Sequence, residues 1–232
     1  MPGSAPAWIT AVFTLLVLVM AGLVVAAVGA LRGRAAAAGT AAALGGWLAL
    51  TAVLAGAGIF ADFSRMPPRL LLAIVAPLIA LVVLCRSAAV GRWLDEAPPG
   101  WLVHPQAFRI VMELILWQLF VAGVLPAIMT FEGRNVDIVV GLTAPMIGWL
   151  CFGRRLWSPR AALWWNLAGI LILLNVVLHA QLSAPTPYRQ IVADPPPTLI
   201  AHAPWIWLPA FLVPLAWGLH VLSIRQLRRR AR

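Results

Sequence analysis

Charged residues are scarce in this chain of 232 residues. Asp, Glu, Lys and Arg together make up 10% of the sequence, whereas hydrophobic residues make up 62%. Soluble globular domains carry about 25% charged residues. A water-soluble fold of this size could not bury so much apolar surface, so the composition excludes a soluble domain and indicates a protein solvated by lipid.

Lysine is absent, so all 17 basic residues are arginine. The microbial rhodopsins bind retinal through a lysine Schiff base, and the missing lysine excludes that family. The two cysteines, Cys85 and Cys151, fall near predicted cytoplasmic helix ends, where a disulfide is not expected. The chain also lacks a nucleotide-binding glycine loop, a zinc-protease helix motif and a serine-nucleophile elbow. These absences favour a protein without enzymatic activity.

Apolar runs of about 20 residues, the length with which a helix crosses a bilayer, recur along the chain. The sequence therefore predicts an all-α, polytopic membrane bundle of seven transmembrane helices, forming one integral membrane domain over residues 1–232. The expected spans are residues 8–31, 40–61, 68–90, 106–130, 136–152, 160–182 and 205–224.

The arginines are distributed unevenly between alternate connections of these spans. Twelve lie in the connections and tail on one side, four lie on the other (Arg65, Arg69, Arg134 and Arg189), and Arg109 falls inside a span. Arginine accumulates on the cytoplasmic side, so we expect the N-terminus outside and the C-terminus inside a bacterial-type inner membrane. The basic tail, residues 225–232, is expected to contact anionic lipid at about 1 kcal/mol per arginine. Nucleic acid is not an expected partner, and the sequence leaves a homo-oligomer open.

Polar residues divide the chain into two unequal parts. Residues 8–91 form an apolar three-helix part rich in Ala and Gly, whose small side chains allow helices in lipid to pack closely. We interpret this part as a scaffold. Residues 104–224 carry the polar residues and prolines within the other four spans, and any functional site is expected there.

Arg109 and Glu113 place one charge of each sign inside a predicted span. A charge at bilayer depth costs about 3 kcal/mol on insertion scales, so such residues are rarely without a role. Arg109 lies about 6 Å into the span and can reach the cytoplasmic surface, whereas Glu113, at about 12 Å, cannot. Two interpretations stay open: an i,i+4 ion pair that neutralises itself, or a titratable carboxylate with an arginine partner that counters its charge or holds an anion.

Further polar side chains in the same four spans suggest a path across the membrane. Ordered by expected depth from the cytoplasm, the path contains Arg109 and His220, then Glu113 and Asn166, then Gln118 and Thr143, and then Asn175, His179 and Asp137. Such a path predicts a proton-linked transporter or permease for a small polar or anionic solute, with Glu113 as the titratable centre.

On the outer face we expect a tight polar turn at residues 130–137 and a long proline-rich loop at residues 183–198. The candidate outer residues are Glu132, Arg134, Asn135, Asp194 and His202. Their oxygen and nitrogen atoms could hold a metal, but their spacing specifies none, and we predict no cofactor.

Two other functions stay open. Histidines on both sides of the membrane allow a redox protein that binds haem or a metal, although neither His104 nor His202 lies within a rigid helix as an axial ligand would. Alternatively, the outer turn and loop could bind a partner in a sensory or assembly subunit that transports nothing.

Overall fold

Helices make up the regular structure of this protein. The computed structural model describes residues 5–231, and within this range there is no β-strand, so the predicted all-α fold is confirmed. The long helices are α1 (Ala7–Arg32), α2 (Arg34–Gly56), α3 (Leu70–Arg86), α8 (Pro159–Ser183) and α9 (Val213–Arg230). The short elements are α4 (Ala88–Glu96), α5 (Gly100–Val103), η1 (His104–Ala107), α6 (Phe108–Val121), η2 (Ala127–Met129), α7 (Ile138–Gly148), η3 (Trp149–Gly153), η4 (Thr198–Ala201) and η5 (Leu208–Leu212).

Among the described residues, four helices are long and apolar enough to cross a membrane: α1, α2, α8 and the helix Leu208–Arg230 formed by η5 and α9. A fifth crossing is counted if α3 and α4, which are bent by 74°, form one span. Large apolar side chains also face outward, as Leu15, Val53 and Leu171 do at 61%, 69% and 65% exposure. Because such side chains are solvated by lipid, the protein is a helical membrane protein.

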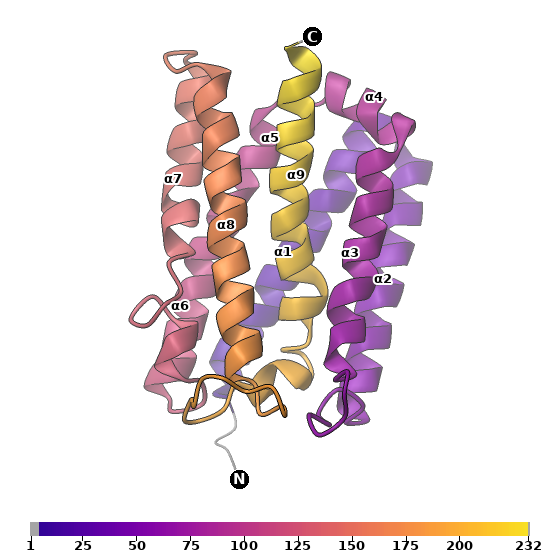
Figure 1. Ribbon diagram of the computed structural model, residues 1–232. Coiled ribbons are helices and arrows are strands. Elements are labelled where there is room, and N and C mark those ends of the chain that lie inside the picture. Colours follow the sequence, from indigo (N-terminus) through magenta and orange to yellow (C-terminus); the bar gives the residue numbers. More distant parts are fainter. Residues whose placement is uncertain (1–4, 232) are drawn as a thin grey trace.

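The helices run side by side with the two termini at opposite ends of the bundle (Figure 1). We call the end that holds the C-terminus the upper end and the other the lower end. Helices α1, α3, α7 and α9 run upward, and α2, α6 and α8 run downward. Gly33, with a φ of 83°, forms the turn between α1 and α2 at the upper end, where a side chain would be strained.

The largest core joins the N-terminal helix to the C-terminal half. On α1, Ile9, Phe13 and Val17 are 0–1% exposed and belong to a cluster with residues of α6 and α9. The rings of Phe13 and Trp205 stack with their centroids 4.5 Å apart. The apolar part expected to be a scaffold therefore shares one core with the part that carries the polar residues.

Helix α4 was not expected from the hydropathy. The Ser87 side chain caps it by accepting a hydrogen bond from the Val90 backbone at 3.5 Å, and Val90, Gly91 and Leu94 face inward. The side chain of Gln226 on α9 donates to the carbonyls of Leu94 and Ala97, at 2.6 and 2.7 Å. An amphipathic helix at the end of a membrane bundle is expected to lie in the interface.

Two predicted boundaries are corrected. Residues 225–230, expected to be a tail, continue α9 as a helix that packs against α4. The helix expected at residues 106–130 is a helical segment that begins at Gly100, passes through η1 and ends at Val121, after which Gly123 adopts a φ of 69°. A positive φ is a common way to end a helix. Hydropathy missed this end because the sequence stays apolar through Met129.

We expect Gln226→Leu to lower the free energy of unfolding by about 1–3 kcal/mol, because the carbonyls of Leu94 and Ala97 lose a buried donor. Denaturant unfolding in detergent micelles, followed by tryptophan fluorescence, measures this loss. Arg228→Gln, at an exposed position of the same helix, is the control and should leave stability unchanged. Equal stability of the two variants would contradict a fastening role for Gln226.

Candidate functional site

Arg109 is the centre of a buried polar cluster. It is the second residue of α6, is 1% exposed, and forms an ion pair with Asp137. Its Nε donates to Oε1 of Gln106 at 3.0 Å. Nε2 of Gln106 in turn donates to the Ala216 carbonyl at 3.1 Å, so the cluster also ties η1 to α9. The hydrogen-bond and ion-pair partners of Arg109 are therefore inside the protein. The side chain was expected to reach the cytoplasmic surface, and it does not.

Asp137 immediately precedes α7, at the end of the helix that carries the positive pole of its dipole. A carboxylate is favoured there, whereas Arg109 followed four residues later by Glu113 is the less favourable order along a helix. Of the two open interpretations, the structure does not show the i,i+4 ion pair: Arg109 pairs with Asp137, just before α7, and not with Glu113.

Residues 122–137 form a return segment that runs back along α6. The stretch of α6 from Arg109 to Val121 is about 18 Å long, and the chain must cover this distance to bring Asp137 back to Arg109. In Figure 1, α7 accordingly begins well above the lower end of the bundle, where α6 ends. The polar turn at residues 130–137 was expected on the outer face; instead it lies beside α6 and α8. Because this turn occupies part of the depth of the bundle, helix α7 is short.

Glu113, one turn below Arg109 on α6, is 2% exposed. Its Oε1 accepts a hydrogen bond of 2.5 Å from Nδ2 of Asn135 in the return segment. The same nitrogen donates to the Met129 carbonyl at 3.0 Å, and Oδ1 of Asn135 accepts from the Asp137 backbone at 3.0 Å. Asn135 therefore connects the Glu113 carboxylate to the backbone of Asp137. Glu113 Oε2 and Arg109 Nη2 are buried and have no hydrogen-bond partner among residues 5–231.

His220 and Asn166 form a second buried group, between α9 and α8, and both are 0% exposed. Nδ2 of Asn166 donates to the Ala162 carbonyl at 2.7 Å and to the Ser223 hydroxyl at 3.0 Å. Its Oδ1 is then the acceptor for Nδ1 of His220, 2.8 Å away. This arrangement leaves His220 Nε2 buried without a partner.

A glycine makes room for the His220 ring. A Cβ atom at Gly169 on α8 would lie 2.5 Å from Nε2, closer than side chains approach one another. The Trp165 ring packs against His220 with a centroid distance of 5.3 Å, and its Nε1 donates to the Thr143 hydroxyl at 2.8 Å. Helix α8 thus connects three residues of the predicted path: Asn166 bonds His220, and Trp165 contacts both His220 and Thr143.

A third group lies where the return segment meets α8. Nδ2 of Asn175 donates to the Arg134 carbonyl at 2.9 Å. His179 Nδ1 lies 2.8 Å from the Asn175 carbonyl, and its Nε2 lies 3.4 Å from Nη1 of Arg134. Glu132 accepts a hydrogen bond of 2.7 Å from Nε1 of Trp117 on α6. Two residues of the predicted path, Asn175 and His179, therefore contact Arg134, which was predicted at the outer face.

Other predicted residues lie apart from these groups. Gln118 is half-buried on α6, and both Asp194 and His202 are exposed in the segment between α8 and η5. Asp137 was expected at the outer end of the path and instead lies beside Arg109. Across residues 5–231, no group of three or more His, Cys, Asp or Glu side chains is arranged to hold a metal.

Gln106 and Ser223 belong to the buried groups and were missed by sequence reasoning. Both lie one turn from a residue that was singled out, Gln106 before Arg109 and Ser223 after His220. Residues three apart share a helical face, so this spacing is the signal that could have identified them.

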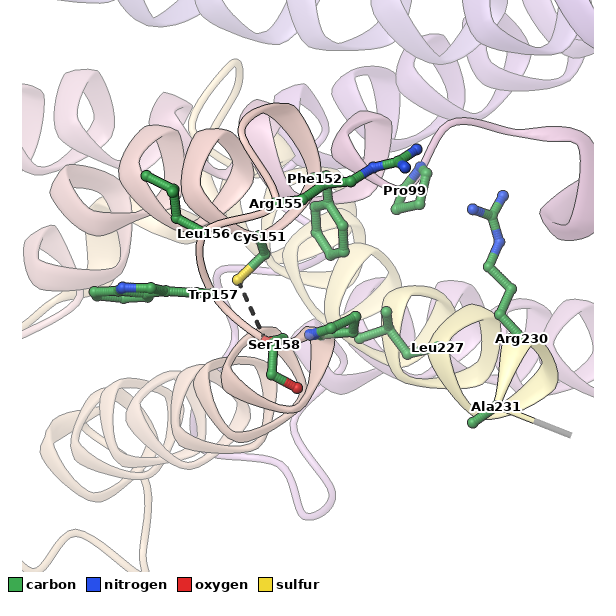
Figure 2. A pocket seen from close by; sticks show the side chains of 11 residues that line it. Pro99, Cys151, Phe152, Arg155, Leu156, Trp157, Ser158, Leu227, Arg230 and Ala231 are labelled. Atoms are coloured by element: carbon green, nitrogen blue, oxygen red, sulfur yellow. Dashed lines mark hydrogen bonds between the residues drawn. The ribbon is translucent and has the colours of Figure 1, made fainter.

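A cavity of about 490 Å³ opens at the upper end, between the η3–α8 turn and the end of α9. Figure 2 shows Arg155 extending from that turn and Arg230 from α9, with Sγ of Cys151 donating to the Ser158 carbonyl at 3.7 Å. Arg155 has a φ of 55°, an uncommon value for a residue other than glycine.

A second cavity, of about 570 Å³, lies between α1, α3 and α9 and has an apolar lining. Neither cavity is lined by Arg109, Glu113 or His220. The buried polar groups are therefore separate from both cavities.

Comparison with known proteins gives one match. Residues 67–228 match a family model described as a domain of unknown function (DUF8737). The match covers more than half of the chain and includes all three polar groups. No curated protein and no solved structure matches the chain.

The Arg109–Asp137 pair can be tested by a double-mutant cycle. Removing one partner of a buried ion pair costs about 3–5 kcal/mol, because the other charge stays buried alone. We expect Arg109→Gln to destabilise the protein by about this amount in detergent unfolding, and Arg109→Gln/Asp137→Asn to recover much of the loss. Arg160→Gln, at an exposed position, is the control. Strictly additive effects of the two substitutions would disprove the coupling.

Proposed function

We propose that this chain, which belongs to the DUF8737 family, is a seven-span protein of the bacterial inner membrane that couples proton transfer to the movement of a small polar or anionic solute. The path runs through residues 104–224. The observation that carries the proposal is the cluster of two carboxyl groups and one guanidinium buried beside the return segment.

The number of spans is inferred from how the shorter elements combine. The bent pair α3 and α4, taken as one span, supplies a crossing in addition to the four long helices. The elements α5, η1 and α6 together cover residues 100–121, a length of 22 residues that suits a span. The return segment and α7 supply another, in which irregular backbone covers part of the depth.

The orientation is inferred from the arginines. Eleven of those that the structure describes lie near the upper end: Arg32, Arg34, Arg86, Arg92, Arg154, Arg155, Arg160, Arg225, Arg228, Arg229 and Arg230. Three lie in the lower connections: Arg65, Arg69 and Arg189. The other two, Arg109 and Arg134, lie on α6 and in the return segment. This distribution supports an upper end in the cytoplasm and an N-terminus outside.

Irregular backbone at membrane depth supports a transport site. Lipid cannot satisfy free backbone groups, so non-helical segments occur there where protein or a polar path surrounds them. In many transporters, interrupted helices place a helix N-terminus at the substrate or ion site. Here the return segment brings the N-terminus of α7 to Arg109 and Glu113, which is the same combination of features.

Charge balance points to Glu113 as the group that carries the proton. With Arg109 charged, the cluster is neutral when one of the two carboxyl groups holds a proton. Asp137 has the guanidinium and the dipole of α7 as partners, whereas Glu113 has the amide of Asn135 and one oxygen without a partner. Neutralisation by a proton is therefore expected at Glu113.

An anionic solute would use Arg109. Its Nη2 is buried without a partner, and a guanidinium matches the planar geometry of a carboxylate or phosphate. An anion that bound there would compete with Asp137, and the displaced carboxylate would favour uptake of a proton by the cluster. Solute and proton would then move together.

Labelling of introduced cysteines tests the orientation. In a background without Cys85 and Cys151, we expect Ser64→Cys in the lower connection to react with a membrane-impermeant maleimide in intact cells. Leu156→Cys at the upper end should react after permeabilisation, as it is then exposed to the reagent from the cytoplasmic side. Labelling of both sites in intact cells would contradict an odd number of spans between them, and the reverse pattern would contradict the orientation.

Proton movement tests the role of Glu113. Proteoliposomes loaded with a pH-sensitive dye would be exposed to acetate, sulfate or inorganic phosphate under an imposed membrane potential. We expect at least one anion to accelerate acidification, and Glu113→Gln to abolish this effect. The glutamine oxygen can still accept the hydrogen bond from Asn135, so the fold should be retained.

Asp62→Asn, in the connection after α2, removes a carboxylate outside the cluster and should transport like the parent protein. Expression and size-exclusion profiles distinguish loss of transport from loss of fold. Undiminished transport by Glu113→Gln, misfolding of this variant, or no anion-dependent acidification by the parent protein would each argue against a proton-carrying glutamate.

A further inference from the structure

The apolar cavity between α1, α3 and α9 has the depth of one bilayer leaflet. It is lined on α1 from Met20 to Leu31, and on η5 and α9 from Ala210 to Leu222. At 1.5 Å per residue these stretches are about 16 and 18 Å long. Half of the hydrocarbon core of a bilayer is about 15 Å thick. The cavity, which we call the leaflet groove, therefore spans the upper leaflet.

Small residues on α3 open the leaflet groove to the exterior of the bundle. Ala76, Pro77 and Ala80 line it, and both alanines are exposed. Larger side chains at these positions would close the gap between α3 and its neighbours. The groove is thus reached from the bilayer and not from the polar cluster.

Helix α4 closes the upper end of the leaflet groove at the level of the headgroups. Trp93 and Leu94 of α4 line the groove, and tryptophan is enriched at this level of a membrane. The Arg32 guanidinium lies 5.4 Å from the centre of the Trp93 ring and pairs with Glu96 at 2.9 Å. Its Nε is buried without a partner, which leaves a donor beside the groove mouth.

The groove mouth carries an excess of positive charge. Arg225 donates to the Ser87 carbonyl at 2.8 Å, and Arg229 pairs with Asp95. The hydrogen bond from Arg229 lowers the pKa of Asp95, so this carboxylate is charged. Arg230 also donates to the Asp95 carbonyl, at 3.2 Å. With Arg32, which pairs with Glu96, these arginines outnumber the carboxylates Asp95 and Glu96. The excess of positive charge suits a negatively charged headgroup.

We propose that the leaflet groove binds an anionic phospholipid, with one acyl chain lying between α1, α3 and α9 and the phosphate at Arg32 beside α4. A flexible, unbranched acyl chain matches the length of the groove and its predominantly apolar lining.

Native mass spectrometry of the detergent-purified protein tests this site, with phosphatidylglycerol and phosphatidylcholine of identical acyl chains as probes. We expect retention of one phosphatidylglycerol in preference to phosphatidylcholine. Ala80→Trp should abolish retention by filling the groove. Arg32→Gln should lower the preference for phosphatidylglycerol about fivefold, the effect of one arginine near an anionic surface.

Matched controls separate the site from general lipid contact. Ile79→Trp is the adjacent position on α3, is 60% exposed and does not line the groove. Arg160→Gln removes an exposed arginine at the upper end of α8. Both should bind lipid like the parent protein. Equal binding of the two lipids by the parent protein, full retention by Ala80→Trp, or equal losses in variants and controls would each overturn the proposal.

Discussion

The ion pair between Arg109 and Asp137 is the constraint on which the C-terminal half depends. It joins the start of α6 to the start of α7, two points separated by the whole length of α6 and the return segment. Neither charge could stay buried in lipid surroundings without the other. The pair therefore fixes where α7 begins, and with it the course of residues 122–137 along α6 and α8. Gln106 extends the same constraint to α9.

The buried polar groups contain few charged residues and many hydrogen bonds. Asn135, Asn166 and Gln106 each use their amide to connect a charged or titratable group to backbone on another segment. A few atoms remain without partners, on Arg109, Glu113 and His220. A buried polar atom without a hydrogen-bond partner is costly in a low-dielectric interior. Binding of a proton or of a polar group of a solute is therefore most favourable at these atoms. The proposed lipid site uses a different part of the molecule, where the arginines of α1 and α9 meet α4.

Much of the fold could be predicted because hydropathy depends on composition alone. The all-helical membrane fold and the approximate positions of α1, α8 and α9 follow from apolar runs and their lengths. The ends of α6 and the existence of the return segment could not be predicted in this way. Residues 124–129 are as apolar as a helix in lipid, yet they contain only the short helix η2. Apolar side chains are favoured wherever they are buried against α1 and α9, whatever the backbone conformation.

The sequence by itself determined that Arg109 and Glu113 lie within an apolar segment and that Glu113 is too deep in it to reach the surface. It could not determine their partners, because a partner is set by distance in space and Asp137 lies 28 positions away from Arg109. The tertiary structure decided that Asp137, expected at the far end of a path, neutralises Arg109, and that Asn135 holds Glu113. It also decided the course of the basic C-terminal residues, which extend α9 because Asp95 of α4 offers a carbonyl to Arg230 and a carboxylate to Arg229.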